Sequence, residues 1–179
     1  IAFGLGLSVL VTVSLSEANL GRQIDTRLAN DAPDWFFIDI QPHQIADFEQ
    51  TVAAINGISQ MDKTPMLRGR VVKLADVPVS EITPPEGSAW ILRGDRALTW
   101  SATPPKGSEL VEGAWWDSNY SGPPLVSMSY EAANDFGLSI GDRVSINVLG
   151  REITATIANL RAVDWESFSI NFVFIFLLL

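Results

Sequence analysis

Serine, histidine and carboxylate side chains are the groups of this chain that could carry out chemistry, because the sequence contains no cysteine. Gly137, Ser139 and Gly141 match the G-x-S-x-G pattern of a nucleophilic serine on a strand-to-helix turn. The elements expected here have the opposite order, with a helix before the turn and a strand after it. The single histidine, His43, also precedes Ser139, whereas hydrolases of that fold place it after the serine. The pattern therefore favours a plain turn over a hydrolase site.

His43, Asp47 and Asp39 form a second candidate cluster. Residues four apart share one face of a helix, and one imidazole with two carboxylates could hold a metal ion. Such a trio is more often a solvated helix start, and the sequence has neither a second histidine nor a cysteine to complete a ligand set. We therefore expect no catalytic residue, no metal site and no cofactor, and we do not expect an enzyme.

Composition narrows the class of protein. The chain has 179 residues, enough for one domain with or without a membrane segment. Its formal charge of −9 argues against a nucleic-acid binder, which needs a basic patch for phosphate. Without cysteine there is no disulfide framework, so the fold must rest on the burial of apolar side chains.

Both ends of the chain lack charge, and this is the strongest signal in the sequence. All 12 basic and 21 acidic residues lie between Glu17 and Glu166. Fifteen helical residues span roughly 22 Å, less than the ~30 Å hydrocarbon core of a bilayer. Because residue 1 is Ile rather than Met, we interpret residues 1–16 as part of a transmembrane helix whose start is missing. A signal-peptide core and a buried core helix are the alternatives.

Residues 17–31 have the spacing of an amphipathic helix. Leu20, Ile24 and Leu28 recur every four residues and would share one face. We expect this segment to continue the membrane helix into water as a stalk, packed through these three side chains. Pro33 ends it, because proline disfavours helix in the residue before it.

The body of the chain, residues 32–166, predicts an α+β fold of mixed small sheets with a few helices. Trp35–Gln41 is interpreted as a buried strand and Gln44–Asn56 as a helix with Ile45 and Phe48 on its apolar face. Further strands are predicted at Met66–Leu74 and, around a turn, at Trp90–Leu92 and Ala97–Ser101.

The last third of this body has the clearest local signals. Leu125–Met128 is predicted as a strand, and Ser129 can cap a helix over Tyr130–Phe136 that ends at a glycine. Two strands then follow, Val144–Val148 and Ile153–Ala162, joined by a turn at Leu149–Arg151.

Residues 167–179 are interpreted as an apolar segment that returns toward the membrane. Trp165 stands just before it, where an indole could lie at the level of lipid headgroups; a core position is an equal alternative. The predicted membrane-proximal junction consists of Asp164, Trp165, Glu166, Phe172, Phe174 and Phe176.

Several of these segments resemble a known family of transporters. Pro124–Ala162, which includes Phe136-Gly137-Leu138-Ser139-Ile140-Gly141-Asp142-Arg143-Val144, resembles the end of the periplasmic core domain of MacB- and FtsX-like ABC transporter permeases. Gly113–Trp116 looks like the glycine–aromatic segment of that family. Arg161–Ser167, Asn171–Phe176 and Trp35–Ile40 resemble the YbbP-type subgroup.

The resemblance implies an extracytoplasmic domain carried on the bacterial inner membrane. Such permeases pair with a separate cytoplasmic ATPase subunit, and two permease copies usually assemble; whether a periplasmic partner docks is left open. ATP-driven motion would reach the outer domain through stalk helices. The alternative is a membrane-anchored module that binds a ligand or partner outside the cell, as a sensor or assembly domain.

Overall fold

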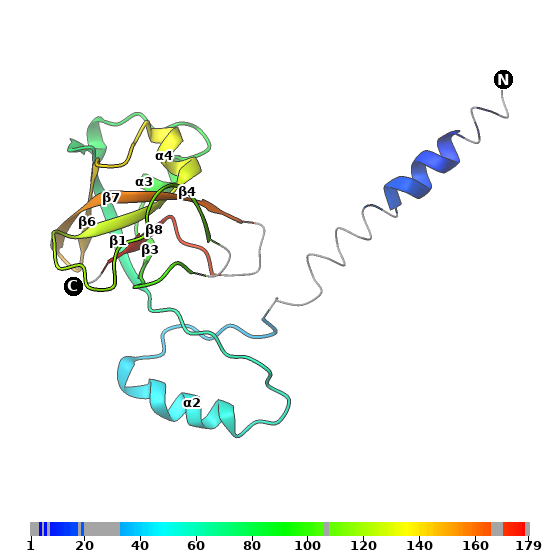
Figure 1. Ribbon diagram of the computed structural model, residues 1–179, viewed down its shortest axis with the longest axis horizontal. Helices are drawn as coiled ribbons and strands as arrows, with labels where there is room; N and C mark the ends of the chain where they lie inside the picture. Colours follow the sequence, from blue (N-terminus) through cyan, green and yellow to red (C-terminus); the bar gives the residue numbers. More distant parts are fainter. Residues whose placement is uncertain are drawn as a thin grey trace. The chain divides into compact units, whose positions relative to one another are not determined.

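The computed structural model describes most of the chain from Pro33 onward and part of the region before it (Figure 1). The described residues are Gly4, Gly6, 8–17, Asn19, 33–105, 108–165 and 170–177. The chain divides into two compact units. The first contains Ile1–Ser59, and the second, which we call the barrel unit, contains Gln60–Trp165 and Ile170–Leu179.

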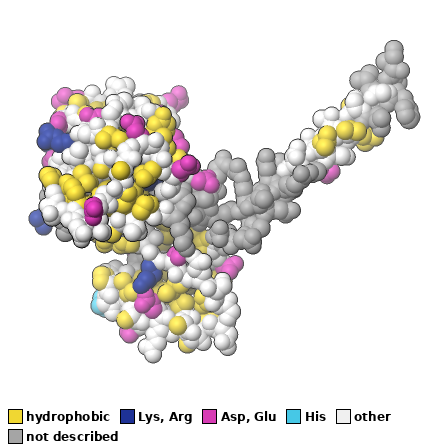
Figure 2. All heavy atoms as spheres, viewed as in Figure 1, with side chains coloured by type: hydrophobic (Ala, Val, Ile, Leu, Met, Phe, Trp, Pro, Cys, Tyr) yellow, Lys and Arg dark blue, Asp and Glu magenta, His cyan; other side chains and the backbone are white. Residues whose placement is uncertain are grey.

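Residues 8–17 of the first unit are helical, and their aliphatic side chains are exposed (Figure 2). Within the described ranges, no helix reaches both the length and the hydropathy needed to cross a bilayer. The transmembrane helix over residues 1–16 therefore stays a prediction. The stalk residues Leu20, Ile24 and Leu28 lie outside the described residues.

The predicted helix over Gln44–Asn56 is confirmed, with shorter bounds. A 3-10 turn, η1 (Pro42–Gln44), leads into α2 (Ile45–Ala53). The strand predicted over Trp35–Gln41 is wrong, because residues 35–41 form no strand and Trp35 is exposed. A strand needs a neighbour for its backbone hydrogen bonds, and the described residues 33–59 supply none; Phe37 instead packs edge-on against Phe48 of α2 at 5.1 Å between centroids.

The described residues of the barrel unit form eight strands and two short α-helices. Its elements are β1 (Leu67–Leu74), β2 (Val77–Pro78), η2 (Val79–Glu81), α3 (Ala89–Leu92), β3 (Arg96–Trp100), β4 (Ser108–Gly113), β5 (Leu125–Ser129), α4 (Tyr130–Phe136), β6 (Arg143–Val148), β7 (Arg151–Val163) and β8 (Phe174–Phe176).

All eight strands belong to one sheet, and six of them close on themselves in the order β1-β3-β8-β5-β7-β6 (Figure 1). The pairs β3–β8 and β5–β7 are parallel, and the other pairs of the ring are antiparallel. β2 and β4 extend the sheet from β1 and β7. The α+β class is confirmed, but one closed sheet replaces the small sheets that were expected, because pairing between distant strands leaves no sequence pattern.

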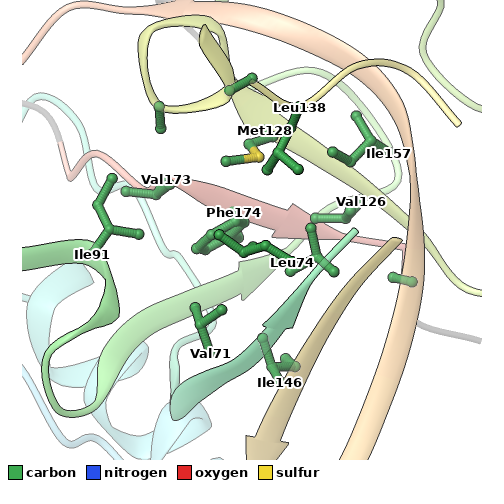
Figure 3. Packing of buried hydrophobic residues seen from close by; sticks show 14 of the residues in the cluster. Val71, Leu74, Ile91, Val126, Met128, Leu138, Ile146, Ile157, Val173 and Phe174 are labelled. Carbon is green, nitrogen blue, oxygen red and sulfur yellow. The ribbon is translucent and has the colours of Figure 1, made fainter. Parts of the chain in front are cut away.

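Alternate residues of the strands fill the inside of the barrel (Figure 3). On β6, for example, Val144, Ile146 and Val148 are buried at a spacing of two, as expected for a strand with one apolar face. Phe174 of β8 is fully buried at the centre of the cluster. The outer face of β8 is covered as well, since Ile175 packs with Trp116.

The end of the chain follows the local signals closely. Ser129 caps α4 by accepting a hydrogen bond from the Ala132 amide, and Gly137 ends the helix with φ 65°. β6 and β7 form the predicted hairpin around Leu149 and Gly150, which both have positive φ. The strand predicted at Trp90–Leu92 is wrong, because these residues form α3.

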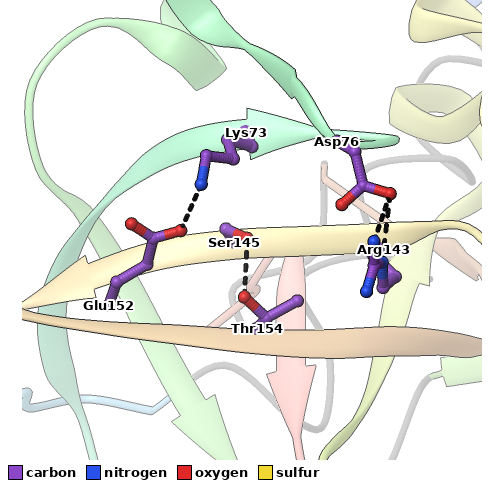
Figure 4. Close-up of polar contacts among 6 residues, drawn as sticks. All are labelled: Lys73, Asp76, Arg143, Ser145, Glu152 and Thr154. Atoms are coloured by element: carbon purple, nitrogen blue, oxygen red, sulfur yellow. Dashed lines mark hydrogen bonds and ion pairs between the residues drawn. The ribbon is translucent and has the colours of Figure 1, made fainter.

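Polar contacts across the outside of β1, β6 and β7 complete the sheet (Figure 4). Lys73 pairs with Glu152 at 2.9 Å, and the hydroxyl oxygens of Ser145 and Thr154 lie 2.8 Å apart between them. The ion pair between Lys73 and Glu152 is exposed, so it contributes at most ~1 kcal/mol to stability. Stability therefore depends on the apolar interior.

Candidate functional site

A pocket of about 240 Å³ is lined by residues of α3 and α4. Its walls come from α3 and α4, from Ser88 and Ser129 just before these helices, and from Trp165, the second residue after β7, so the pocket lies entirely within the barrel unit. We call it the tryptophan pocket. Its lining residues are Ser88, Trp90, Ile91, Ser129, Glu131, Ala132, Asp135 and Trp165.

Two indole rings form the aromatic walls of the tryptophan pocket. Trp90 of α3 and Trp165 meet edge to face, with 6.1 Å between ring centroids and an interplanar angle of 87°. They are 44% and 45% exposed, so a ligand in solvent can reach them. The Arg96 guanidinium group lies 5.7 Å from the Trp90 centroid, but Arg96 does not line the pocket.

Two carboxylates of α4 form the polar wall. Glu131 and Asp135 are four residues apart and therefore project from the same side of the helix. Glu131 Oε2 accepts hydrogen bonds from Trp165 Nε1 at 3.2 Å and from Ser129 Oγ at 2.9 Å. Asp135 Oδ2 accepts a hydrogen bond from Ser88 Oγ. These bonds fix the direction of both carboxylates.

Arg161 of β7 lies beneath this wall and is only 1% exposed. Burial lowers the pKa of Arg161 to about 10, and the negative charge of Glu131 raises the pKa and so offsets part of that decrease. The guanidinium Nη2 donates to the carbonyl oxygens of Phe172 and Val173, at 3.3 Å for Val173. Arg161 thus joins β7 to the segment before β8 and supplies a positive charge near Glu131.

The chemistry of this arrangement suits binding better than reaction. A serine needs an adjacent base such as histidine or lysine to become a nucleophile, whereas the hydroxyl groups of Ser88 and Ser129 donate to carboxylates, and the lining residues include neither histidine nor lysine. Two aromatic faces beside carboxylates instead form a surface for a cation.

The structure places the predicted junction residues in different environments. Asp164 is exposed, Trp165 lines the tryptophan pocket, and Glu166 lies outside the described residues. Phe172, Phe174 and Phe176 are buried in the barrel unit: Phe174 and Phe176 fill its interior, and Phe172 packs in the outer cluster with Ile175. A membrane-proximal role for this group stays a prediction.

Neither of the two candidate clusters from the sequence contributes a residue to the lining of the pocket. Gly137 and Gly141 shape the turn from α4 to β6, with φ values of 65° and 96°, and the Ser139 amide donates to Asp142 at 2.8 Å. This confirms the helix-to-strand order. His43 belongs to the first unit, and the described ranges contain no group of three His, Cys, Asp or Glu side chains placed to hold a metal.

Sequence reasoning missed most of the tryptophan pocket. The four-residue spacing of Glu131 and Asp135 in the predicted helix was the available signal that the two carboxylates share one face. Nothing local indicated that Trp90 would approach Trp165, because the two lie 75 residues apart in the chain. Arg161 gave no sign of burial by its residue type, because a charged side chain is usually exposed.

Similarity to known proteins bears on the whole chain rather than on the pocket. The chain is 30% identical, over 98% of its length, to an Escherichia coli K12 protein named as an uncharacterized ABC transporter permease, YbbP. It is similar to part of a permease. The chain spans about a fifth of that protein's length, since the match covers 20% of it. No family model matches the chain, and no solved structure matches it.

Proposed function

We propose that this chain is the extracytoplasmic part of an ABC transporter permease and has no catalytic role of its own. The observation that carries the proposal is the 30% identity to YbbP across nearly the whole chain. A permease is a membrane-bound transporter subunit, so the similarity favours a transport-related function. The resemblance of the sequence to MacB- and FtsX-like permeases supports our proposal that the folded body, residues 32–166, lies on the periplasmic side of the bacterial inner membrane.

The proposed partners follow from this role. A cytoplasmic ABC ATPase would supply the energy, a second permease copy would complete a dimer, and lipid would hold the apolar residues 1–16. The net charge of −9 argues against nucleic acid as a partner. A periplasmic protein that receives or delivers cargo is a further partner of this arrangement.

The closed sheet of the barrel unit supports a mechanical role, because a closed and packed sheet would move as a unit. Its ring of six strands is closed, and a packed interior resists deformation. Motion of a stalk helix would therefore displace the whole barrel rather than bend it. Coupling also requires that the stalk be packed, since a loose linker absorbs the displacement; in our proposal Leu20, Ile24 and Leu28 provide that packing.

The test is to replace Leu20, Ile24 and Leu28 together with Ser in the full-length permease, co-purified with its ATPase. We expect the permease-dependent ATPase rate to fall several-fold, because polar residues would unpack the stalk face and uncouple the two subunits.

The matched control replaces Arg22 and Asp25, which the helical spacing predicts to lie away from the Leu20, Ile24 and Leu28 face, with Ser. We expect this variant to retain the wild-type ATPase rate at equal expression. An unchanged rate in the Leu20, Ile24 and Leu28 variant would refute the stalk proposal.

The side of the membrane can be tested independently. The chain has no cysteine, and Leu149 at the β6–β7 turn is 92% exposed. We expect Leu149→Cys in otherwise cysteine-free permease to react with a membrane-impermeant maleimide in spheroplasts. Labelling only after the membrane is permeabilised would place the barrel in the cytoplasm and contradict the proposal.

A further inference from the structure

We propose that the tryptophan pocket binds a small organic cation, namely a compact quaternary or alkylammonium group. The proposal goes beyond the permease role and does not depend on it. It rests on the aromatic walls, on the balance of charge along α4 and on the size of the pocket.

The indoles of Trp90 and Trp165 supply two perpendicular walls, at 87° to each other. A cation within about 6 Å of an indole centroid is attracted by the negative ring face, and aromatic cages recognise quaternary ammonium ligands in this way. Arg96 already approaches Trp90 to 5.7 Å from outside the pocket. The ring environment therefore tolerates a positive charge.

The carboxylates differ in how far their charge is balanced. Glu131 interacts with Arg161, and the buried positive charge of Arg161 offsets the negative charge of Glu131. The hydrogen-bond partner of Asp135 is the neutral hydroxyl group of Ser88. Asp135 consequently gives the pocket a negative charge that would attract a cation to the tryptophan walls.

Size limits the ligand to a small group. The pocket holds about 240 Å³, less than the roughly 300–1,000 Å³ typical of sites for drug-sized ligands. Ile91 and Ala132 add apolar surface to the lining, which suits the methyl groups of a quaternary ammonium ion better than a strongly hydrated metal ion. Such an ion could arrive free or as the end of a lipid headgroup.

Isothermal titration calorimetry of the full 179-residue chain with choline chloride tests the proposal. The chain is kept in a maltoside detergent, which carries no ammonium group. We expect saturable binding of choline. We expect no binding of 3,3-dimethylbutan-1-ol, the uncharged analogue of choline in which carbon replaces the quaternary nitrogen. Phosphocholine distinguishes the two sources: binding at least equal to that of choline supports a lipid headgroup, and weaker binding supports a free amine.

Two variants locate the binding. We expect Trp165→Ala and Asp135→Asn each to weaken choline binding roughly fivefold to tenfold, because each removes one attraction of about that size. Glu109→Gln, which removes an exposed carboxylate of β4 outside the pocket, is the matched control and should bind as wild type. Circular dichroism verifies folding, and Trp165→Phe, which keeps a smaller ring, replaces Trp165→Ala if that variant unfolds.

Three outcomes would overturn the proposal. The first is the absence of saturable choline binding to the wild-type chain. The second is equal binding of choline and dimethylbutanol, which would indicate a merely apolar hollow. The third is wild-type affinity in folded variants of both Trp165 and Asp135.

Discussion

Arg161 shows how one buried charge can determine how the stability of the barrel unit depends on pH. Its pKa is lowered to about 10 by burial, with a smaller opposite effect of Glu131. Below about pH 9 the guanidinium group is charged in both the folded and the unfolded chain. It therefore does not make the free energy of unfolding depend on pH in this range. Above about pH 10 the unfolded chain binds more protons than the folded one, and stability rises with pH.

The substitution Arg161→Lys should move the increase in the free energy of unfolding to a lower pH, at which it can be measured. The unfolded pKa of lysine is ~10.4, and the same burial lowers the pKa of the folded state below that value. Between the two pKa values the unfolded chain binds more protons, so the unfolding free energy of the variant should increase with pH. Urea unfolding at several pH values measures the slope.

The control for this prediction is Arg151→Lys, an exposed position on the same strand. It should keep the flat profile of the wild type below pH ~10. A flat profile for Arg161→Lys as well would show that this position is better hydrated than its 1% exposure indicates.

At the level of residues, the sequence predicted what depends on near neighbours. Ser129 was identified as a helix cap because its partner amide, that of Ala132, lies three residues away. The contact of Trp165 with Trp90, and the burial of Arg161 under residues 172–173, depend on how distant segments meet. No spacing rule within one segment carries that information.

Single elements are constrained most strongly where the backbone leaves no room for a side chain. Gly113 ends β4 with φ 80°, and a Cβ atom there would lie 2.6 Å from the Ala158 carbonyl oxygen of β7. Gly150 has a similar φ of 86°, but nothing lies within 4 Å of its added Cβ. The two positions separate the cost of a positive φ from the cost of a backbone clash.

Gly150→Ala should destabilise the barrel unit by about 1 kcal/mol, the usual cost of left-handed backbone for an L residue. Gly113→Ala should destabilise it by roughly 3 kcal/mol or more, because β4 or β7 must also move. Denaturant unfolding of both variants gives the difference. Equal losses would mean that β4 shifts away from β7 at little cost.

The same contrast between local and distant information explains which elements were predicted. α4 and the β6–β7 hairpin carry their own cap and turn residues and were predicted with nearly correct bounds. Trp90–Leu92 is a short apolar run whose pattern cannot distinguish strand from helix. Trp35–Gln41 has the composition of a strand, but in the described part of the chain no strand pairs with it.

For the whole molecule, the division into two units predicts which part folds alone. Every residue of the described chain that is buried lies in the barrel unit, from Gly69 onward. Residues 60–179 should therefore unfold cooperatively by themselves. Residues 60–169, which lack β8, should give no cooperative thermal transition, because the ring opens between β3 and β5 and Phe174 is lost from the interior.

Calorimetry of the two fragments checks this prediction. A cooperative transition of residues 60–169 near that of residues 60–179 would show that the ring does not depend on β8. Failure of residues 60–179 to fold would show that the first unit contributes to stability.

The order of strands also has a consequence for biosynthesis. β8 pairs with β3 through Thr99 and Ile175, and with β5 through Ser127 and Ile175, so the nascent chain cannot finish the barrel until residue 176 has left the ribosome. Before that moment the facing edges of β3 and β5 lack their neighbour and are open to wrong partners. Maturation should therefore be a late, single event, and a holdase chaperone that covers these edges would act on the unfinished polypeptide rather than on the native protein.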